Sequence, residues 1–331
     1  MRPFIYDRAD SAESAASSAQ EGKAAFLAGG TTLIDLMKLD VMRPDRVIDI
    51  NGLAPKHAGI VAESRGLRLG AMARMADAAE HPLVKRDYPV IADTLRLAAS
   101  PQLRNMASLG GNVLQRTRCN YFRDTSWGAC NKRDPGSGCA ALDGVNRKHA
   151  VLGVSEHCIA TYPGDFAQAL IALEAAVEIV GADGRARIAL FEELHQVPGS
   201  TPQIETTLQP GDLIIGFVVP SGPWTRRSLY LKIRDRDSYE FALASAAVAL
   251  DLDGDQVRTV RIALGGVATK PWRAHAAEQV LVGKRLTEES AERAARAAFA
   301  DAVSHGDNRY KIELGPRTLV RALLEAQAMK V

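Results

Sequence analysis

The sequence has no hydrophobic run that approaches the roughly 18 residues needed to span a bilayer. Its most apolar stretch, residues 241–250, is rich in Ala, is interrupted by Ser245 and is too short, so we predict a buried core element there. Neither sign of charge is in excess, since 41 Lys and Arg face 39 Asp and Glu. No run of basic residues alternates with aromatic residues, as in many nucleic-acid-binding segments. The sequence therefore predicts neither membrane insertion nor nucleic-acid binding.

We also expect no secretory signal at the N-terminus. Residues 1–10 (MRPFIYDRAD) turn acidic and small before an apolar segment can form, whereas a signal peptide needs an apolar stretch of about 7–15 residues. Taken alone, this pattern favours the cytoplasm.

Cysteine is scarce, and three of the four cysteines lie in residues 115–147, an irregular segment rich in Gly, Arg, Asn and Asp. A loop of this length is unusual in a compact domain unless it is functional or cross-linked. Disulfides mostly stabilise domains too small for a full core, and a structural zinc site usually has Cys pairs about two to four residues apart, which this chain lacks. A [4Fe–4S] cluster needs four thiolates and accepts wide spacing. Spacing alone leaves all three interpretations open for Cys119, Cys130, Cys139 and Cys158.

The 331 residues suffice for two domains, each with its own core. Residues 1–50 alternate helical segments with short apolar strands, a pattern typical of a small α/β unit. Pro220 ends an apolar segment and is followed by Ser-Gly-Pro, which favours a domain boundary at 221–223. The predicted elements are helices at 11–20, 32–39, 77–99 (broken at Pro89) and 165–175, strands at 24–28, 46–50, 66–70, 213–219 and 228–233, regular structure at 149–154, a hairpin at 176–190, two apolar segments flanking 251–255, and two final helices, the last beginning at Pro316.

Two glycine pairs are candidates for ligand contact. Residues 26–33 (FLAGGTTL) predict a strand that turns through Gly29 and Gly30 into a helix. Glycines there allow a sharp turn whose N–H groups face one concavity, and the helix start adds positive potential suited to a pyrophosphate. Residues 104–112 (RNMASLGGN) contain a second pair between a hydroxyl and an amide. The first segment is neither a GxGxxG nor a Walker A motif, and a tight turn without a ligand explains it equally well. For the second segment alone, a bulge or tight turn is the commoner explanation.

Taken together, AGGTxL near residue 30 and RNxA[ST]xGGN near residue 110 resemble the flavoprotein subunits and domains of the xanthine dehydrogenase and aldehyde oxidase family. Later segments of the chain resemble the same family in the same order, so the resemblance spans nearly the whole chain. It is strongest to the FAD subunit of bacterial three-subunit aldehyde oxidoreductases of the periplasmic type. The later segments are 160–165 (ATYPGD), 211–215 (GDLII), 230–236 (YLKIRDR), 263–268 (ALGGVA) and 270–272 (KPW).

The resemblance implies an α+β fold. An FAD-binding domain of the vanillyl-alcohol-oxidase (PCMH) type, in two subdomains, would cover residues 1–222, and a smaller C-terminal α+β domain would cover 223–331. The pyrophosphate of FAD would lie over the Gly29–Gly30 turn, and Ser108 stands where Thr is usual in the family. The implied FAD-binding residues are Ala25, Phe26, Leu27, Ala28, Gly29, Gly30, Thr31, Thr32, Leu33, Ser108, Gly111, Asn112, Asp165, Ile215 and Lys232.

The cysteine segment resembles the cluster-bearing insertion of the aldehyde oxidoreductase branch, at about residues 115–158. The resemblance implies that Cys119, Cys130, Cys139 and Cys158 bind a [4Fe–4S] cluster. The basic residues of the insertion would offset the negative charge of the thiolates and the cluster, unless they simply form a solvated basic loop. These residues are Arg116, Arg118, Arg123, Lys132 and Arg133.

By the same resemblance, the chain is an electron-transfer subunit of a molybdenum hydroxylase that oxidises aldehydes to carboxylic acids. Its partners would be a large molybdenum-cofactor subunit and a small [2Fe–2S] subunit, in a heterotrimer that passes electrons through FAD to an external acceptor. No catalytic side chain is expected, because the flavin carries the redox chemistry, and His149, His157 and His195 are expected to be structural. We expect a periplasmic location through co-export with a signal-bearing partner, with the cytoplasm as the alternative.

Three other functions stay open. The chain could be the equivalent subunit of a hydroxybenzoyl-CoA reductase or of a purine hydroxylase. It could be a scaffold subunit without flavin. It could also be a stand-alone FAD reductase whose cysteine loop holds zinc or disulfides.

Overall fold

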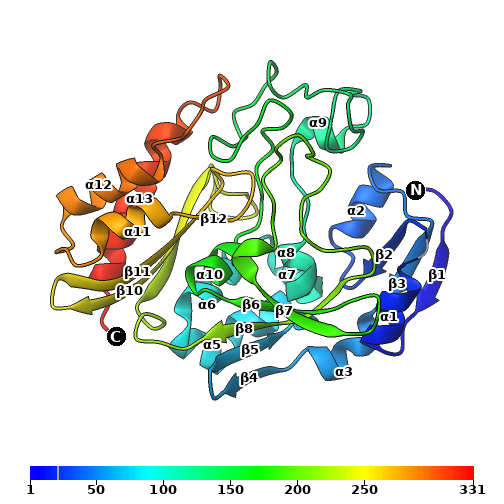
Figure 1. Ribbon diagram of the computed structural model, residues 1–331, viewed down its shortest axis with the longest axis horizontal. Helices are drawn as coiled ribbons and strands as arrows, with labels where there is room; N and C mark the ends of the chain where they lie inside the picture. Colours follow the sequence, from blue (N-terminus) through cyan, green and yellow to red (C-terminus); the bar gives the residue numbers. More distant parts are fainter. Residues whose placement is uncertain (21) are drawn as a thin grey trace.

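Three parallel strands form the N-terminal sheet of the computed structural model, which describes residues 1–20 and 22–331 (Figure 1). Their order is β1 (Ile5–Arg8), β3 (Arg46–Asp49) and β2 (Ala24–Leu27). Helix α1 (Ala12–Ser18) follows β1, and α2 (Leu33–Lys38) follows β2. The α/β pattern predicted for residues 1–50 is therefore confirmed. β1 escaped prediction because it is a mostly exposed edge strand without an alternating apolar pattern.

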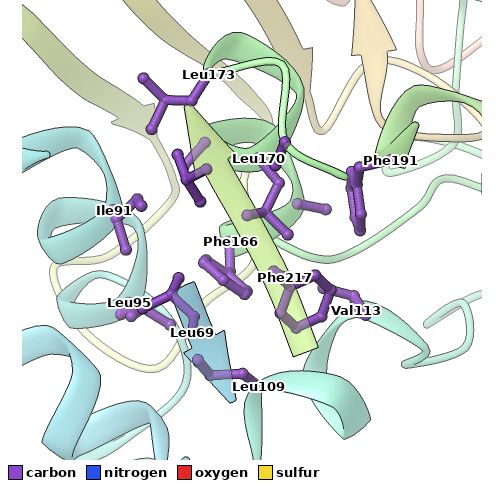
Figure 2. Close-up of a cluster of buried hydrophobic side chains, with 14 of the residues drawn as sticks. Leu69, Ile91, Leu95, Leu109, Val113, Phe166, Leu170, Leu173, Phe191 and Phe217 are labelled. Atoms are coloured by element: carbon purple, nitrogen blue, oxygen red, sulfur yellow. The ribbon is translucent and has the colours of Figure 1, made fainter. Parts of the chain in front are cut away.

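An antiparallel sheet of five strands follows, in the order β4, β5, β8, β6, β7. Leu67 and Leu69 on β5 and Phe217 on β8 point into one buried core, as period-two alternation requires. Helices α6 and α10 pack on this face, and Figure 2 shows Phe166 of α10 lying against Phe217. The elements are β4 (Ile60–Glu63), β5 (Gly66–Gly70), α4 (Met75–Glu80), α5 (Pro82–Asp87), α6 (Pro89–Arg96), α10 (Phe166–Ala172), β6 (Ala176–Val180), β7 (Ala186–Leu190) and β8 (Leu213–Pro220).

The C-terminal part of the chain forms an antiparallel sheet in the order β12, β11, β10, β9, with three helices packed against it (Figure 1). Alternate residues of β10 are buried on opposite faces, since Val248 faces these helices while Ala247 and Ala249 join the core of Figure 2. This two-sided burial explains the Ala-rich run and confirms the predicted core element. The elements are β9 (Ser228–Ile233), β10 (Ala244–Asp253), β11 (Gln256–Gly265), β12 (Trp272–Arg273), α11 (His275–Leu281), α12 (Glu288–Ala298) and α13 (Lys311–Gln327).

Three local predictions are wrong. The helix predicted at 77–99 is broken at His81 as well as before Pro89, so it forms α4, α5 and α6. The last helix begins at Lys311 rather than Pro316, so the proline lies inside α13 and three helices follow the sheet instead of two. Residues 149–154 form only an isolated bridge, between Leu152 and Ala268, rather than the predicted regular structure. The division at residue 222 stays a prediction, because β10 contributes to the cores on both sides of it.

Short elements connect the three sheets, and the cysteine segment contains only one helix, α9, among the described residues. No helix in the described part of the chain has the length and apolar character needed to cross a membrane. The connecting elements are η1 (Asn51–Leu53), α3 (Ala54–His57), α7 (Pro101–Met106), α8 (Leu109–Val113), α9 (Asn120–Arg123) and η2 (Phe191–Glu193).

Candidate functional site

The first glycine pair forms the turn between β2 and α2, and each glycine is needed for a different reason. Gly30 has a φ of +72°, a conformation that side-chain-bearing residues rarely adopt. A Cβ on Gly29 would lie 2.0 Å from the carbonyl oxygen of Met106. The turn therefore depends on glycine at both positions and is pressed against the start of the second glycine segment.

Five consecutive backbone amides in this turn, those of residues 29–33, donate no hydrogen bond to any described residue. All five residues line one cavity. N–H groups that lack a hydrogen-bond acceptor, at a glycine turn that leads into a helix, favour the binding of an anion. The turn is ready to bind such a group.

Two residues that the sequence analysis does not single out hold the turn in place. The Asn51 side chain donates from Nδ2 to the carbonyl oxygen of Ala28 at 2.9 Å. Arg74 donates to the carbonyl oxygen of Met106 and to Asn51 Oδ1. No local motif marks these residues, because they act across different segments of the chain.

The second glycine segment leads into α8 and lines the same cavity. Ser108 Oγ accepts a hydrogen bond from the backbone amide of Gly111 at 3.2 Å. The amide of Gly110 donates to the carbonyl oxygen of Ala71 at 2.8 Å. Ser108, Gly110 and Gly111 line the cavity, whereas the Asn112 amide group donates to Met75 Sδ.

We call this space, of about 320 Å³, the glycine cavity. It brings together most of the FAD-binding residues predicted before residue 112. Leu27, Asn112 and Ile215 are not among its lining residues, and Ile214 lines it instead. The predicted residues that line it are Ala25, Phe26, Ala28, Gly29, Gly30, Thr31, Thr32, Leu33, Ser108 and Gly111.

A second space, the adjoining cavity, has a volume of about 360 Å³ and shares Met42, Leu114 and Arg116 with the glycine cavity. Its wall also includes residues 202–206 and the side chain of Lys270. The sequence singles out Arg116 only as a basic residue of the insertion, since its neighbours give no signal that it borders two cavities.

Glu205 in this wall binds two cations, Arg116 and Lys132, and the Lys132 Nζ to Glu205 Oε1 distance is 3.0 Å. Burial would raise the pKa of Glu205, but the two cations hold that pKa below its ordinary value. Glu205 is therefore ionised at neutral pH.

The predicted residues Asp165 and Lys232 bind each other away from the lining of the glycine cavity. Lys232 Nζ lies 2.7 Å from Asp165 Oδ2, and the two side chains are 1% and 4% exposed. Tyr230 donates its hydroxyl to Asp165 Oδ1 at 2.5 Å. Burial raises the pKa of Asp165, and the ammonium of Lys232 offsets part of that effect. A contact of this pair with a flavin stays a prediction.

The four cysteines lie around one small space of about 10 Å³, and all four are free thiols. The backbones of Cys130 and Cys139 face each other across a bridge. Burial raises the pKa of Cys119 to about 12 and that of Cys158 to about 11, so these thiols need a bound metal to lose their protons. Four sulfur donors around one space, two of them buried and two partly exposed, match the Cys₄ ligand set of an iron–sulfur cluster.

Within residues 1–20 and 22–331, no three His, Cys, Asp or Glu side chains are already arranged to hold a single metal ion. The fit to a cluster therefore depends on the shared space and on the thiol chemistry. It does not depend on a preformed coordination shell.

Four of the five basic residues of the insertion form ion pairs with carboxylates outside it, whereas Arg133 bonds within the insertion. Arg118 and Arg123 pair with Asp35 on α2. Arg133 donates to the backbone carbonyl oxygens of Tyr121 and Phe122. These contacts differ from the solvated basic loop that is the alternative interpretation.

Two of the three lone histidines are buried and neutral. Burial lowers the pKa of His149 and of His195 to about 4. His195 Nε2 bonds the carbonyl oxygen of Val113 at 2.9 Å, and His149 Nε2 lies 3.2 Å from Cys119 Sγ. His157 is exposed.

Comparisons with known proteins agree with this arrangement. Residues 2–222 match the family described as the FAD binding domain in molybdopterin dehydrogenase, and residues 229–326 match the CO dehydrogenase flavoprotein C-terminal domain. The chain is 46% identical over 329 residues to the aldehyde oxidoreductase FAD-binding subunit PaoB of Escherichia coli (strain K12), covering 99% of each chain. It is 29% identical over 311 residues to the carbon monoxide dehydrogenase medium chain of Afipia carboxidovorans, covering 91% of this chain and 88% of that one.

A solved structure has the same fold. Carbon monoxide dehydrogenase from Hydrogenophaga pseudoflava, in a form that lacks the Mo-pyranopterin moiety, aligns with a TM-score of 0.77 at 28% identity over 99% of both chains. The predicted fold, an FAD-binding domain followed by a C-terminal α+β domain, is confirmed.

Proposed function

This chain belongs to the FAD-binding subunits of the molybdenum hydroxylase family, and from this we propose that it binds FAD across the two cavities and a [4Fe–4S] cluster on its cysteines. We further propose that it carries electrons in a complex that oxidises aldehydes. The observation that carries the proposal is the glycine turn, with five uncommitted amides at the edge of the glycine cavity.

The shape of the site suits a dinucleotide. The glycine cavity offers backbone amides for a pyrophosphate and apolar side chains for the groups beside it. The adjoining cavity shares Met42, Leu114 and Arg116 with the glycine cavity, so one extended ligand would contact both. FAD has a pyrophosphate between two ring systems, and the flavin ring would lie in the adjoining cavity.

The residues around the two cavities then have distinct roles in binding FAD. Bound FAD supplies the redox chemistry, accepting and releasing electrons. The amides of residues 29–33 bind the phosphates, and Asn51 with Arg74 keeps the turn in the binding geometry. Lys132 and Arg116 keep positive charge beside the adjoining cavity.

The cluster proposal is supported by the four thiols that share one buried space and by the loop that surrounds it. Cys158 lines both this space and the adjoining cavity. A cluster bound there would lie beside the flavin end of the FAD site, which suits electron exchange between them.

The proposal of an aldehyde substrate follows the 46% identity to an aldehyde oxidoreductase subunit, against 29% to a carbon monoxide dehydrogenase chain. The test is purification of the native complex with its partner subunits. We expect FAD, about four iron atoms and four labile sulfides assigned to this chain, and reduction of the flavin by an aromatic or aliphatic aldehyde. A complex whose flavin is reduced by carbon monoxide or a purine, and not by aldehydes, would contradict the substrate assignment.

A further inference from the structure

The wall between the adjoining cavity and the cysteine site contains a buried lysine. Lys132 follows Cys130 by two positions and lines both spaces. Its side chain is 10% exposed, and Nζ donates to Glu205 Oε1 at 3.0 Å and to the carbonyl oxygen of Pro202 at 2.9 Å. The ammonium is therefore held in one position between the two proposed redox sites.

Glu205 links this lysine to a second cation that lines the adjoining cavity, Arg116. Arg116 pairs with the same carboxylate, lies over the Phe122 ring at 4.6 Å from its centroid, and borders both cavities. The side chains of Arg116 and Glu205 are 22% and 27% exposed. One carboxylate thus pairs with two cations, so the charges of these three side chains do not cancel.

The charges around the adjoining cavity can be counted. Its charged lining residues in the described part of the chain are Arg116, Lys132, Lys270 and Glu205, which together give a net charge of plus two. His195 also lines it but is neutral. Replacing Lys132 by Met lowers this net charge by one, and replacing Glu205 by Gln raises it by one.

We propose that Lys132 and Glu205 are a pair of positioning residues that set the reduction potential of the flavin in opposite directions. The inference rests on the proposed function, in which the flavin ring occupies the adjoining cavity. Two-electron reduction adds negative charge to a flavin, so a fixed cation favours the reduced form and a fixed carboxylate favours the oxidised form. The effect is stronger than in bulk water, because these side chains are partly buried and the local dielectric constant is lower.

The test measures the equilibrium between oxidised and reduced flavin in the purified full chain carrying FAD, titrated against redox dyes. Lys132→Met is expected to lower the ratio of reduced to oxidised flavin by about tenfold at a fixed potential, a shift of about 30 mV for two electrons. Glu205→Gln is expected to raise that ratio by about the same factor.

Two control variants separate charge from structure. Lys132→Arg keeps the charge and is expected to leave the potential unchanged. Lys85→Met removes an exposed lysine that pairs with Glu80 outside both cavities, and it too should leave the potential unchanged. FAD and iron contents are measured for every variant.

Each result decides the proposal. Shifts of opposite sign for Lys132→Met and Glu205→Gln support it. Shifts of the same sign would mean that both residues act only by holding residues 202–206, and unchanged potentials with FAD bound would overturn it. If Glu205→Gln does not fold, the comparison of Lys132→Met with Lys132→Arg decides alone. A wild-type chain that binds no FAD would instead overturn the proposed function.

Discussion

Gly30→Val is expected to abolish FAD binding while the chain still folds. The backbone of Gly30 has a φ of +72°, and a side chain in this conformation costs about 1–2 kcal/mol. The new Cβ would lie 3.1 Å from Ile34 Cγ1 and 3.2 Å from Leu27 Cδ1, so the γ-methyls of Val have little free space around the turn. We expect the turn to shift and the amides of residues 29–33 to leave their present positions at the glycine cavity.

The β10–β11 turn offers a matched control. Gly254 also has a positive φ, of +58°, and a Cβ there would meet nothing within 4 Å. Gly254→Val therefore carries similar backbone strain, about 1–2 kcal/mol, without touching either cavity. Both variants should lose about that much of the free energy of unfolding in the absence of FAD.

Urea unfolding with and without FAD separates the two effects. At a ligand concentration of about 100 times Kd, a bound ligand adds about 2.7 kcal/mol to the free energy of unfolding. Wild type and Gly254→Val should gain this amount, and Gly30→Val should gain none. The visible absorbance of the flavin gives the bound stoichiometry independently. Full FAD occupancy in Gly30→Val would refute the assignment of the turn.

Three further predictions follow from other parts of the site. Replacing any one of the four cysteines by Ser should sharply lower the iron and labile sulfide of anaerobically purified protein and increase protease cleavage in residues 115–147; unchanged iron in all four variants would exclude the cluster. Lys232→Met leaves the buried Asp165 without its cation and should cost about 3–5 kcal/mol in urea unfolding, whereas a loss below about 1 kcal/mol would show that the pair is not needed for stability. The native chain should co-purify with a molybdenum subunit and a small iron–sulfur subunit, and a free monomer in cell extract that reduces an acceptor with NADH would contradict this.

The sequence predicts best those parts of the fold that depend on local patterns. The two glycine segments line one cavity, although more than 70 residues separate them. Period-two and helical patterns predict most strands and helices, and the hairpin predicted at 176–190 is formed by β6 and β7. Strands, helices and turns can be predicted from sequence because burial of one face requires apolar residues at a fixed spacing along the chain, and turns require particular residue types.

Features that depend on contacts between distant segments were not visible. The start of α13 was misplaced because Pro316 resembles a first-turn proline, while the helix actually begins five residues earlier at Lys311. Asn51, Arg74 and Glu205 carry no motif, since their roles come from partners in other segments. Long-range ion pairs of this kind can be identified only once the fold has brought the partners together.

The cysteine insertion is attached to both halves of the proposed FAD site. Asp35 lies on α2, the helix that follows the glycine turn, and it pairs with Arg118 and with Arg123 of the insertion, the latter at 2.8 Å. Glu205 lies in the wall of the adjoining cavity and pairs with Lys132, also of the insertion. Because the insertion has few regular elements of its own, a bound cluster would order it, and these ion pairs would transmit that order to the walls of both cavities. Loss of the cluster should therefore weaken FAD binding as well as remove iron, even though no cysteine lines the glycine cavity.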